Sequence, residues 1–196
     1  MGKDIQHFYE YVYSVEGNNQ KYIAMGHSLG TYVWLNALAS YTDMDIDALV
    51  LISGGSVNNL NKLNAIKENS RYFSHINKWK AFLSIFNPNI KPIYIVFPDI
   101  PQLKQSGFVQ DYGFSFFSMF RDSKDRFNGF YKNTNIPIMM ISGSQDELFK
   151  AENIEESYNL IENKNKKLVN LKGKTHTSII WSAGSHIISW LENNLK

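Results

Sequence analysis

The residue pattern with the clearest chemical meaning is the pentapeptide GHSLG at residues 26–30. It fits G-x-S-x-G, a pattern in which a serine lies on a strained turn between a strand and a helix with its hydroxyl exposed. We expect glycine at positions 26 and 30 because side chains there would collide where strand and helix come close. A glycine-flanked serine in an ordinary loop is the alternative. However, a β-prone run precedes the pentapeptide and a helix-forming run follows it, which favours Ser28 as a nucleophile.

A serine hydroxyl becomes a good nucleophile only when a base takes its proton, and that base needs a carboxylate to orient it. Candidates for both roles follow later apolar runs. Asp146 comes just after IPIMMI, and His176 comes just after KKLVNL. In open α/β sheets, catalytic groups gather beyond the carboxyl ends of the strands. We therefore predict that Ser28, Asp146 and His176 meet at one sheet edge as nucleophile, acid and base.

Other residues compete for these roles. Glu147 adjoins Asp146 and is an alternative acid, although the turn directly after the strand favours the aspartate. His27 is expected to pack structurally beside the serine. An isolated Asp more often caps a turn, and an isolated His more often lies at the surface or in a satisfied core position. The remaining histidines lie in predicted helices or in the central region, away from strand ends: His7, His75 and His186.

Short apolar runs and helical patterns alternate along most of the chain. We predict strands at 21–25, 47–55, 135–143 and 166–171, and helices at 3–15, 29–40, 147–163 and 185–195. Continuous apolar runs are typical of parallel strands that are covered on both faces. The alternation predicts an α/β fold with a mainly parallel sheet and flanking helices.

Residues from about 56 to 134 break this alternation. They are rich in Asn, Lys and aromatic residues and contain four of the five prolines. We interpret them as a cap inserted into a single domain of residues 1–196. Aromatic residues bury large areas wherever they pack, so the phenylalanines of this region are expected to form the core of the cap; lining an apolar channel for an acyl chain is the alternative. They are Phe82, Phe86, Phe97, Phe108, Phe114, Phe116, Phe117 and Phe120.

Composition excludes several classes of function. The formal charge of +2 comes from 20 basic and 18 acidic residues without a basic block, so nucleic acid is not expected as a partner. There are no cysteines, the five histidines lack paired metal-ligand spacing, and SGGS at 53–56 lacks the lysine of a phosphate-binding loop. We therefore expect neither a metal nor a cofactor. Without a signal-like or membrane-spanning apolar stretch, a soluble cytoplasmic protein is expected.

Four segments together resemble the α/β-hydrolase superfamily, and within it the lysophospholipase and monoacylglycerol-lipase-like serine hydrolases. They are YIAMGHSLG, ALVLISGG, NIPIMMISGSQD and LVNLKGKTHTSIIW, and they occur in the order of that superfamily. The resemblance implies a partial α/β-hydrolase fold, a serine nucleophile, an acyl-enzyme intermediate and hydrolysis by water without a cofactor.

The resemblance also reveals a departure, because only about twenty residues precede the GHSLG strand where the family has several strands and helices. The N-terminal strands are therefore expected to be absent. Of the two backbone N–H groups that form the oxyanion hole in this fold, only that of Leu29 is expected. Losing one donor typically costs about 2.7 to 4 kcal/mol of transition-state stabilisation. The KYIAM strand would become an open sheet edge, through which the chain could form a homo-oligomer.

Two functions follow from these observations. The first is a serine hydrolase that cleaves a carboxylic ester, either a small or medium acyl ester or a lysophospholipid-like lipid. Thioester, amide and peptide hydrolysis and acyl transfer would use the same residues, and the fold does not choose among them. The second is a catalytically impaired hydrolase fragment that acts as a binding module or needs a partner chain.

Overall fold

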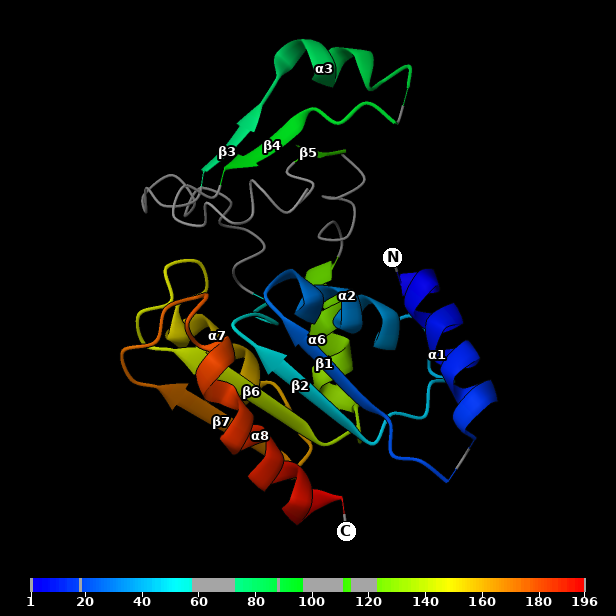
Figure 1. The fold of residues 1–196 in the computed structure, drawn as a ribbon, viewed down its shortest axis with the longest axis vertical. Helices are drawn as coiled ribbons and strands as arrows, with labels where there is room; N and C mark the ends of the chain where they lie inside the picture. The colour runs from blue at the N-terminus through cyan, green and yellow to red at the C-terminus, as the bar shows by residue number, and fades with distance from the viewer. Residues whose placement is uncertain are drawn as a thin grey trace. The chain divides into compact units, whose positions relative to one another are not determined.

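The computed structural model describes residues 2–17, 19–57, 73–87, 89–96, 111–113 and 123–195. The chain forms two compact units, Met1–Leu60 with Asp122–Lys196, and Asn61–Arg121. Figure 1 shows the strands and helices of each unit. The first unit contains all the residues of the predicted site.

A four-stranded parallel sheet forms the centre of the first unit, in the order β1-β2-β6-β7. The strands are β1 (Ile23–His27), β2 (Ala48–Ile52), β6 (Ile138–Gly143) and β7 (Lys166–Leu171). The two inner strands, β2 and β6, are buried at every position because helices cover both faces of the sheet. Within the described residues, β1 pairs only with β2 and is an edge strand. The α/β fold with a mainly parallel sheet is confirmed.

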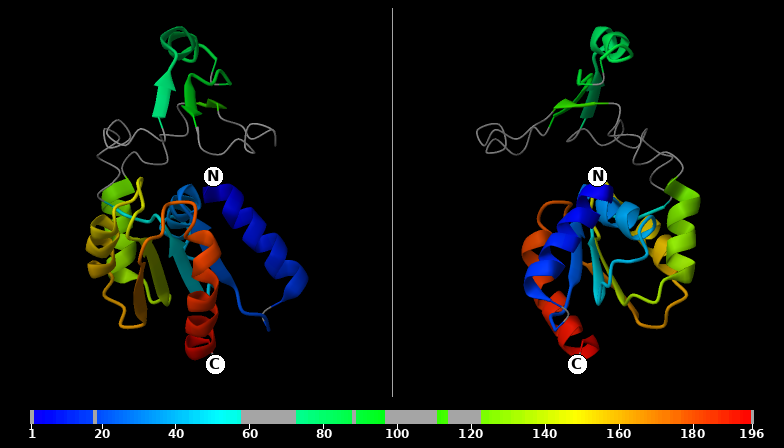
Figure 2. Two further views of the ribbon diagram at one scale, coloured as in Figure 1. Left: turned by 60° about the vertical axis from the view of Figure 1, so that its left-hand side comes forward. Right: turned by 90° about the vertical axis from the view of Figure 1, so that its right-hand side faces the viewer.

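In the part of the chain that the structure describes, five helices surround this sheet. They are α1 (Gly2–Glu16), α2 (Leu29–Leu38), α6 (Ser123–Asn133), α7 (Ala151–Asn159) and α8 (Ile180–Asn194). Helix α8 covers one face, α6 and α7 lie on the other face, and α1 packs against α2 beside the β1 edge (Figures 1 and 2). Helix α6 falls inside the range predicted as cap, 56–134, but it belongs to the first unit, where its Phe127 and Tyr131 are fully buried.

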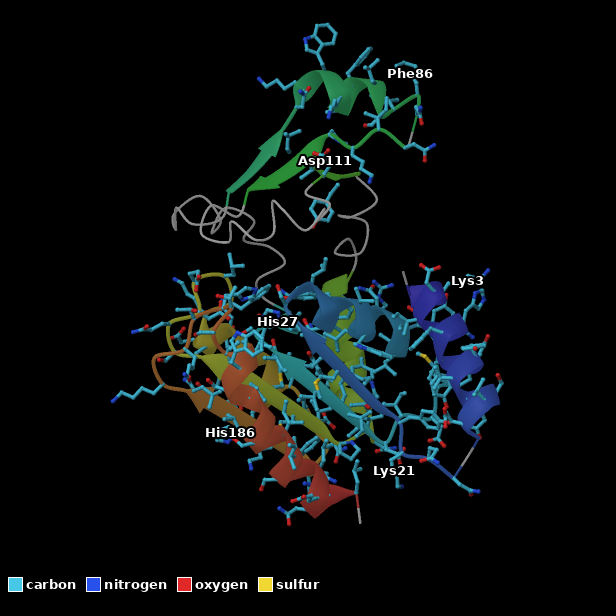
Figure 3. All side chains as sticks on the ribbon, viewed as in Figure 1. Lys3, Lys21, His27, Phe86, Asp111 and His186 are labelled. Atoms are coloured by element: carbon cyan, nitrogen blue, oxygen red, sulfur yellow. The ribbon has the colours of Figure 1, made fainter. Side chains whose placement is uncertain are left out.

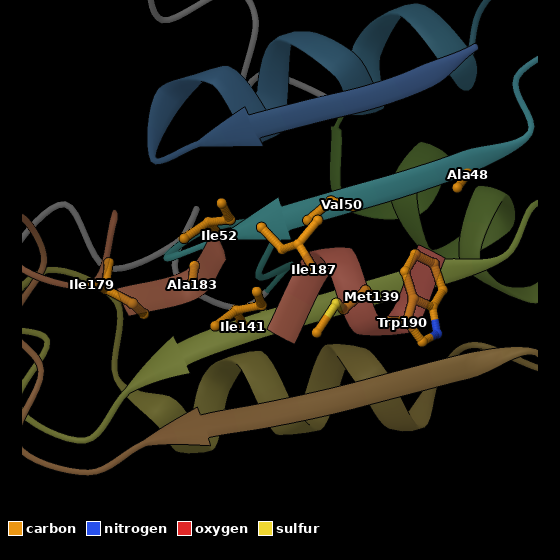
Figure 4. Close-up of a cluster of buried hydrophobic side chains, with 9 residues drawn as sticks. All are labelled: Ala48, Val50, Ile52, Met139, Ile141, Ile179, Ala183, Ile187 and Trp190. Carbon is orange, nitrogen blue, oxygen red and sulfur yellow. The ribbon is translucent and has the colours of Figure 1, made fainter. Parts of the chain in front are cut away.

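The core between α8 and the sheet explains why this helix packs as it does. Ile179, Ala183, Ile187 and Trp190 recur at helical spacing and are all buried. They contact alternate residues of β2 and β6, which point to the same face (Figure 4): Ala48, Val50, Ile52, Met139 and Ile141.

The described residues of the second unit form an antiparallel sheet in the order β3-β4-β5 and one short helix. Its elements are β3 (Phe73–Ile76), α3 (Lys78–Leu83), β4 (Ile93–Val96) and β5 (Asp111–Tyr112). Of the eight phenylalanines predicted to form a core or a channel here, only Phe82 and Phe86 are described, and both are exposed. The other six lie outside the described residues.

Candidate active site

Ser28 lies on a strained turn between β1 and α2. Its backbone has φ 53° and ψ −119°, in a region that non-glycine residues rarely occupy. Several hydrogen bonds hold this conformation. The Ser28 N–H donates to the carbonyl of Ile52 at 2.9 Å. The carbonyl of Ser28 accepts from the N–H of Thr31 at 3.1 Å and from its hydroxyl at 2.6 Å. The strand, turn and helix predicted around the serine are confirmed.

The two glycines of the pentapeptide differ in the space around them. A Cβ on Gly26 would lie 2.5 Å from the carbonyl carbon of Gly30, a distance that packing does not permit. A Cβ on Gly30 would meet no atom within 4 Å. The predicted collision is therefore confirmed at Gly26 and wrong at Gly30. The helix backbone at Gly30, rather than a side chain, comes close to the strand.

Two further loops bring a histidine and an aspartate to the serine. The Nε2 atom of His176 lies 2.9 Å from the Oγ of Ser28. On the other side of the ring, Nδ1 lies 3.2 Å from Oδ2 of Asp146. Asp146 follows β6 and His176 follows β7, so parallel strands deliver all three side chains to the same sheet edge. Asp146 and His176 are both buried, with 7% and 5% of their surfaces exposed.

The second oxygen of Asp146 is held by the backbone of its own turn. Oδ1 accepts from the N–H groups of Leu148 at 2.9 Å and Phe149 at 2.8 Å. Burial alone would raise the pKa of this carboxyl group. The hydrogen bond and charge interaction with His176 and the Phe149 N–H outweigh burial and lower the pKa below its usual value. Asp146 is thus a charged group next to the imidazole at neutral pH.

Glu147, the alternative acid, has a different position. One of its carboxylate oxygens accepts from the backbone N–H of His176 at 3.1 Å. Asp146 therefore contacts the histidine ring, whereas Glu147 holds the histidine backbone. Consecutive carboxylates after β6 fix both parts of His176.

His27 forms a hydrogen bond with His176 in addition to packing against its ring. Its Nε2 atom lies 2.9 Å from the carbonyl oxygen of His176, so Nε2 carries the hydrogen and donates it. The two imidazole rings are 4.7 Å apart, and the ring of Phe149 lies 5.5 Å from His176. Burial and the neighbouring imidazole lower the pKa of His27, which keeps its ring neutral. Figure 3 labels His27 in the first unit. Sequence reasoning missed this hydrogen bond, since nothing in the pentapeptide identifies a partner 149 residues away.

Leu29, the predicted oxyanion donor, is the first residue of α2. The first N–H groups of a helix have no partner within the helix, and they carry its partial positive charge. The Leu29 N–H is therefore suitable for binding an oxygen anion beside Ser28. Within the part of the chain that the structure describes, no three potential ligand side chains gather around a common metal position.

Comparison with solved structures identifies the fold. A monoacylglycerol lipase from Paleococcus ferrophilus superposes with a TM-score of 0.60 at 15% identity, over 98% of this chain and 74% of that one. The chain has the α/β-hydrolase fold. A soluble variant of monoglyceride lipase from Saccharomyces cerevisiae in complex with a substrate analogue gives a TM-score of 0.62 at 16% identity, covering 98% of this chain and 68% of the other.

A third solved structure, the esterase domain of a protein from Rhodothermus marinus, gives a TM-score of 0.65 at 11% identity over 100% of this chain and 70% of that one. No protein-family model matches the sequence, and no curated protein matches it. The α/β-hydrolase fold predicted from the four segments is therefore confirmed. This chain spans only part of the length of these structures, from 68% to 74%. No described helix is long and apolar enough to cross a membrane.

Proposed function

We propose that this protein is a serine hydrolase that cleaves carboxylic esters through an acyl-enzyme intermediate. The observation that carries the proposal is the continuous contact from the Ser28 hydroxyl through the His176 ring to the Asp146 carboxylate, with distances of 2.9 and 3.2 Å. That is the arrangement in which a base can take a serine proton while a carboxylate orients the base.

In the first step, the Ser28 oxygen attacks the ester carbonyl carbon while His176 Nε2 accepts the hydroxyl proton. Asp146 keeps the ring oriented, holds its Nδ1–H and stabilises the imidazolium that forms. The negative charge on the former carbonyl oxygen is stabilised by the Leu29 N–H at the helix start. His176 then gives its proton to the leaving alcohol. A water molecule, activated by the same histidine, hydrolyses the acyl-serine.

For the substrate, we propose an acylglycerol or lysophospholipid-like ester. The support for this finer class is the sequence resemblance together with the similarity of the fold to two proteins described as monoacylglycerol or monoglyceride lipases. Hydrolysis of p-nitrophenyl esters of increasing acyl length, followed by monoacylglycerol and lysophosphatidylcholine, tests the class directly. Activity confined to short acyl chains would contradict it.

The chemistry itself is tested by covalent labelling with a fluorophosphonate probe. We expect the parent chain to be labelled, and the Ser28→Ala and His176→Ala variants to lose labelling. Ser189→Ala, an exposed serine on α8, is the matched control that keeps it. If a folded parent chain stays unlabelled, this chain does not activate Ser28, and the alternative of a binding module or a chain that needs a partner becomes the better account.

A further inference from the structure

The second unit exposes a group of large apolar side chains on α3 and the turn that follows it. Trp79, Phe82 and Leu83 are spaced i, i+3 and i+4, so they share one face of α3, and Phe86 in the turn continues the spacing at i+7. Their exposed fractions are 78%, 53%, 47% and 75%. Ile85 in the turn is also exposed. These five residues are called the α3 apolar surface below.

The backbone of this segment is well ordered by local hydrogen bonds. The Asn77 side chain caps α3 by accepting from the Lys80 N–H at 3.0 Å. At the other end, Phe86 N–H donates to the Leu83 carbonyl at 3.1 Å, which extends the helical path into the turn. The Phe82 and Phe86 rings meet edge to face at 5.6 Å. Phe86 is labelled at the end of this segment in Figure 3. Local hydrogen bonds therefore hold the backbone that carries these apolar side chains.

Positive charge borders the α3 apolar surface. Lys78 and Lys80 lie on opposite flanks of the apolar face, about 100° to either side of Trp79 by helical spacing. Lys91 adds a third positive charge before β4, and the stretch from 70 to 98 contains no Asp or Glu. An apolar face with an aromatic residue and flanking lysines matches the polarity profile of a bilayer interface, where Trp and Lys lie at headgroup level.

We propose that the α3 apolar surface docks on an anionic lipid bilayer, with its aromatic and aliphatic side chains in the acyl boundary and Lys78 and Lys80 at the headgroups. A second copy of the chain fits this surface less well. In a symmetric contact, the lysines of both copies would come together without any acidic residue of the segment between them. The proposal is independent of the proposed chemistry at Ser28.

Co-sedimentation of the full chain with vesicles tests this docking. The vesicles are phosphatidylcholine alone or phosphatidylcholine with about 30% phosphatidylglycerol, a fraction chosen to give a clearly negative surface. We expect binding to the anionic vesicles that weakens as salt rises. The Trp79→Ala/Phe86→Ala variant should lose about tenfold or more in partitioning. The Lys78→Gln/Lys80→Gln variant should lose about fivefold per lysine, on anionic vesicles only.

Trp181→Ala is the matched control, because Trp181 on α8 is 90% exposed but belongs to the first unit. This variant should bind vesicles as the parent chain does. Circular dichroism verifies that each variant is folded. Three outcomes overturn the proposal. The parent chain does not bind anionic vesicles, or the Trp181 and Trp79/Phe86 variants lose vesicle binding equally. In the third, the chain self-associates in a way that depends on Trp79 and Phe86 and does not bind vesicles. The last outcome would make this surface an interface between copies. Because none of these measurements uses esterase activity, their failure is distinct from failure of the proposed function.

Discussion

The two carboxylate oxygens of Asp146 have separate tasks. Oδ2 contacts the His176 ring and Oδ1 accepts from the Leu148 and Phe149 backbone. Replacing Asp146 by Asn keeps the size of the side chain but removes its charge and presents an NH2 group to one of these donors. We expect kcat for ester hydrolysis to fall by about four orders of magnitude, since the neutral amide would no longer favour the productive imidazole tautomer. Steady-state kinetics with a p-nitrophenyl ester measures this, and a drop of less than tenfold would contradict the role of the acid.

The same variant tests how the free energy of unfolding depends on pH. Because the folded state lowers the pKa of Asp146 below its ordinary value of 3.8, the carboxylate adds stability above that pH, and this contribution is lost as the pH falls through the lowered value. The parent chain should therefore exceed Asp146→Asn in free energy of unfolding at pH 7, and the difference should shrink at pH 3. Urea unfolding at both pH values provides the comparison. A difference that is constant with pH would show that the carboxylate charge is not responsible.

His27 is expected to act as a positioning residue, because its ring N–H holds the His176 carbonyl. His27→Leu removes this donor, whereas His27→Gln retains an N–H at similar reach. We predict that the Leu variant loses about ten- to a hundredfold in kcat/KM, with most of the loss in kcat, because small displacements of a catalytic group are costly. The Gln variant should recover much of that loss. Equal activity in both variants would show that the contact serves packing only.

At the scale of secondary structure elements, the crossing of β1 and α2 explains the glycine at position 26 but not the one at position 30. Gly26→Ala should destabilise the fold strongly, because the added methyl group would lie 2.5 Å from the Gly30 backbone and neither element can yield easily. Gly30→Ala is its matched control: the position is helical and open, so alanine should be tolerated or stabilise by about 0.5 to 1 kcal/mol. Denaturant unfolding distinguishes the two variants. Comparable destabilisation by both would contradict the close approach at Gly26.

The elements that periodicity predicts well are those whose pattern comes from burial on both faces. The strand runs ALVLI and IMMISG, which are buried at every position, lie where the sequence places them, within a few residues. Helix α7 begins at Ala151 rather than 147, because the preceding N–H groups of Leu148 and Phe149 are used by Asp146. Helix α8 begins at Ile180 rather than 185. Sequence periodicity does not predict its first turn because Ile180 and Trp181 are apolar but exposed, which breaks the amphipathic pattern.

For the site, sequence order could bring Ser28, Asp146 and His176 to one edge, because the carboxyl ends of parallel strands coincide. It could not predict the separate position of Glu147 on the His176 backbone. That contact depends on how the loop after β6 is positioned relative to the loop after β7, and no local sequence pattern encodes this. The six phenylalanines outside the described residues remain a prediction.

At the scale of the whole molecule, the open edge of the first unit's sheet is the feature with the broadest consequence. The backbone groups of the even-numbered residues along β1 face β2. At the two ends of the strand, the Ser28 N–H donates to the Ile52 carbonyl and the Tyr22 carbonyl accepts from the Asp47 N–H. The backbone groups of Ile23, Met25 and His27 therefore point to the open side. One of them is already bonded: the Trp34 indole N–H donates to the Met25 carbonyl at 3.0 Å. Trp34 thus partly blocks an edge to which another strand could add.

Two substitutions should change association through this edge in opposite directions. Trp34→Phe frees the Met25 carbonyl while keeping an aromatic ring, so we expect more association at high protein concentration. Met25→Lys places a charge at a half-exposed edge position and should reduce association, as lysines do on natural edge strands. Sedimentation velocity over a wide concentration range measures both effects, with Ile188→Lys on the exposed side of α8 as the control for added charge. If the parent chain and the Trp34 variant both stay monomeric throughout, β1 is not a site of association. If the Ile188 variant reduces association as much as the Met25 variant does, general charge repulsion rather than the strand edge is responsible.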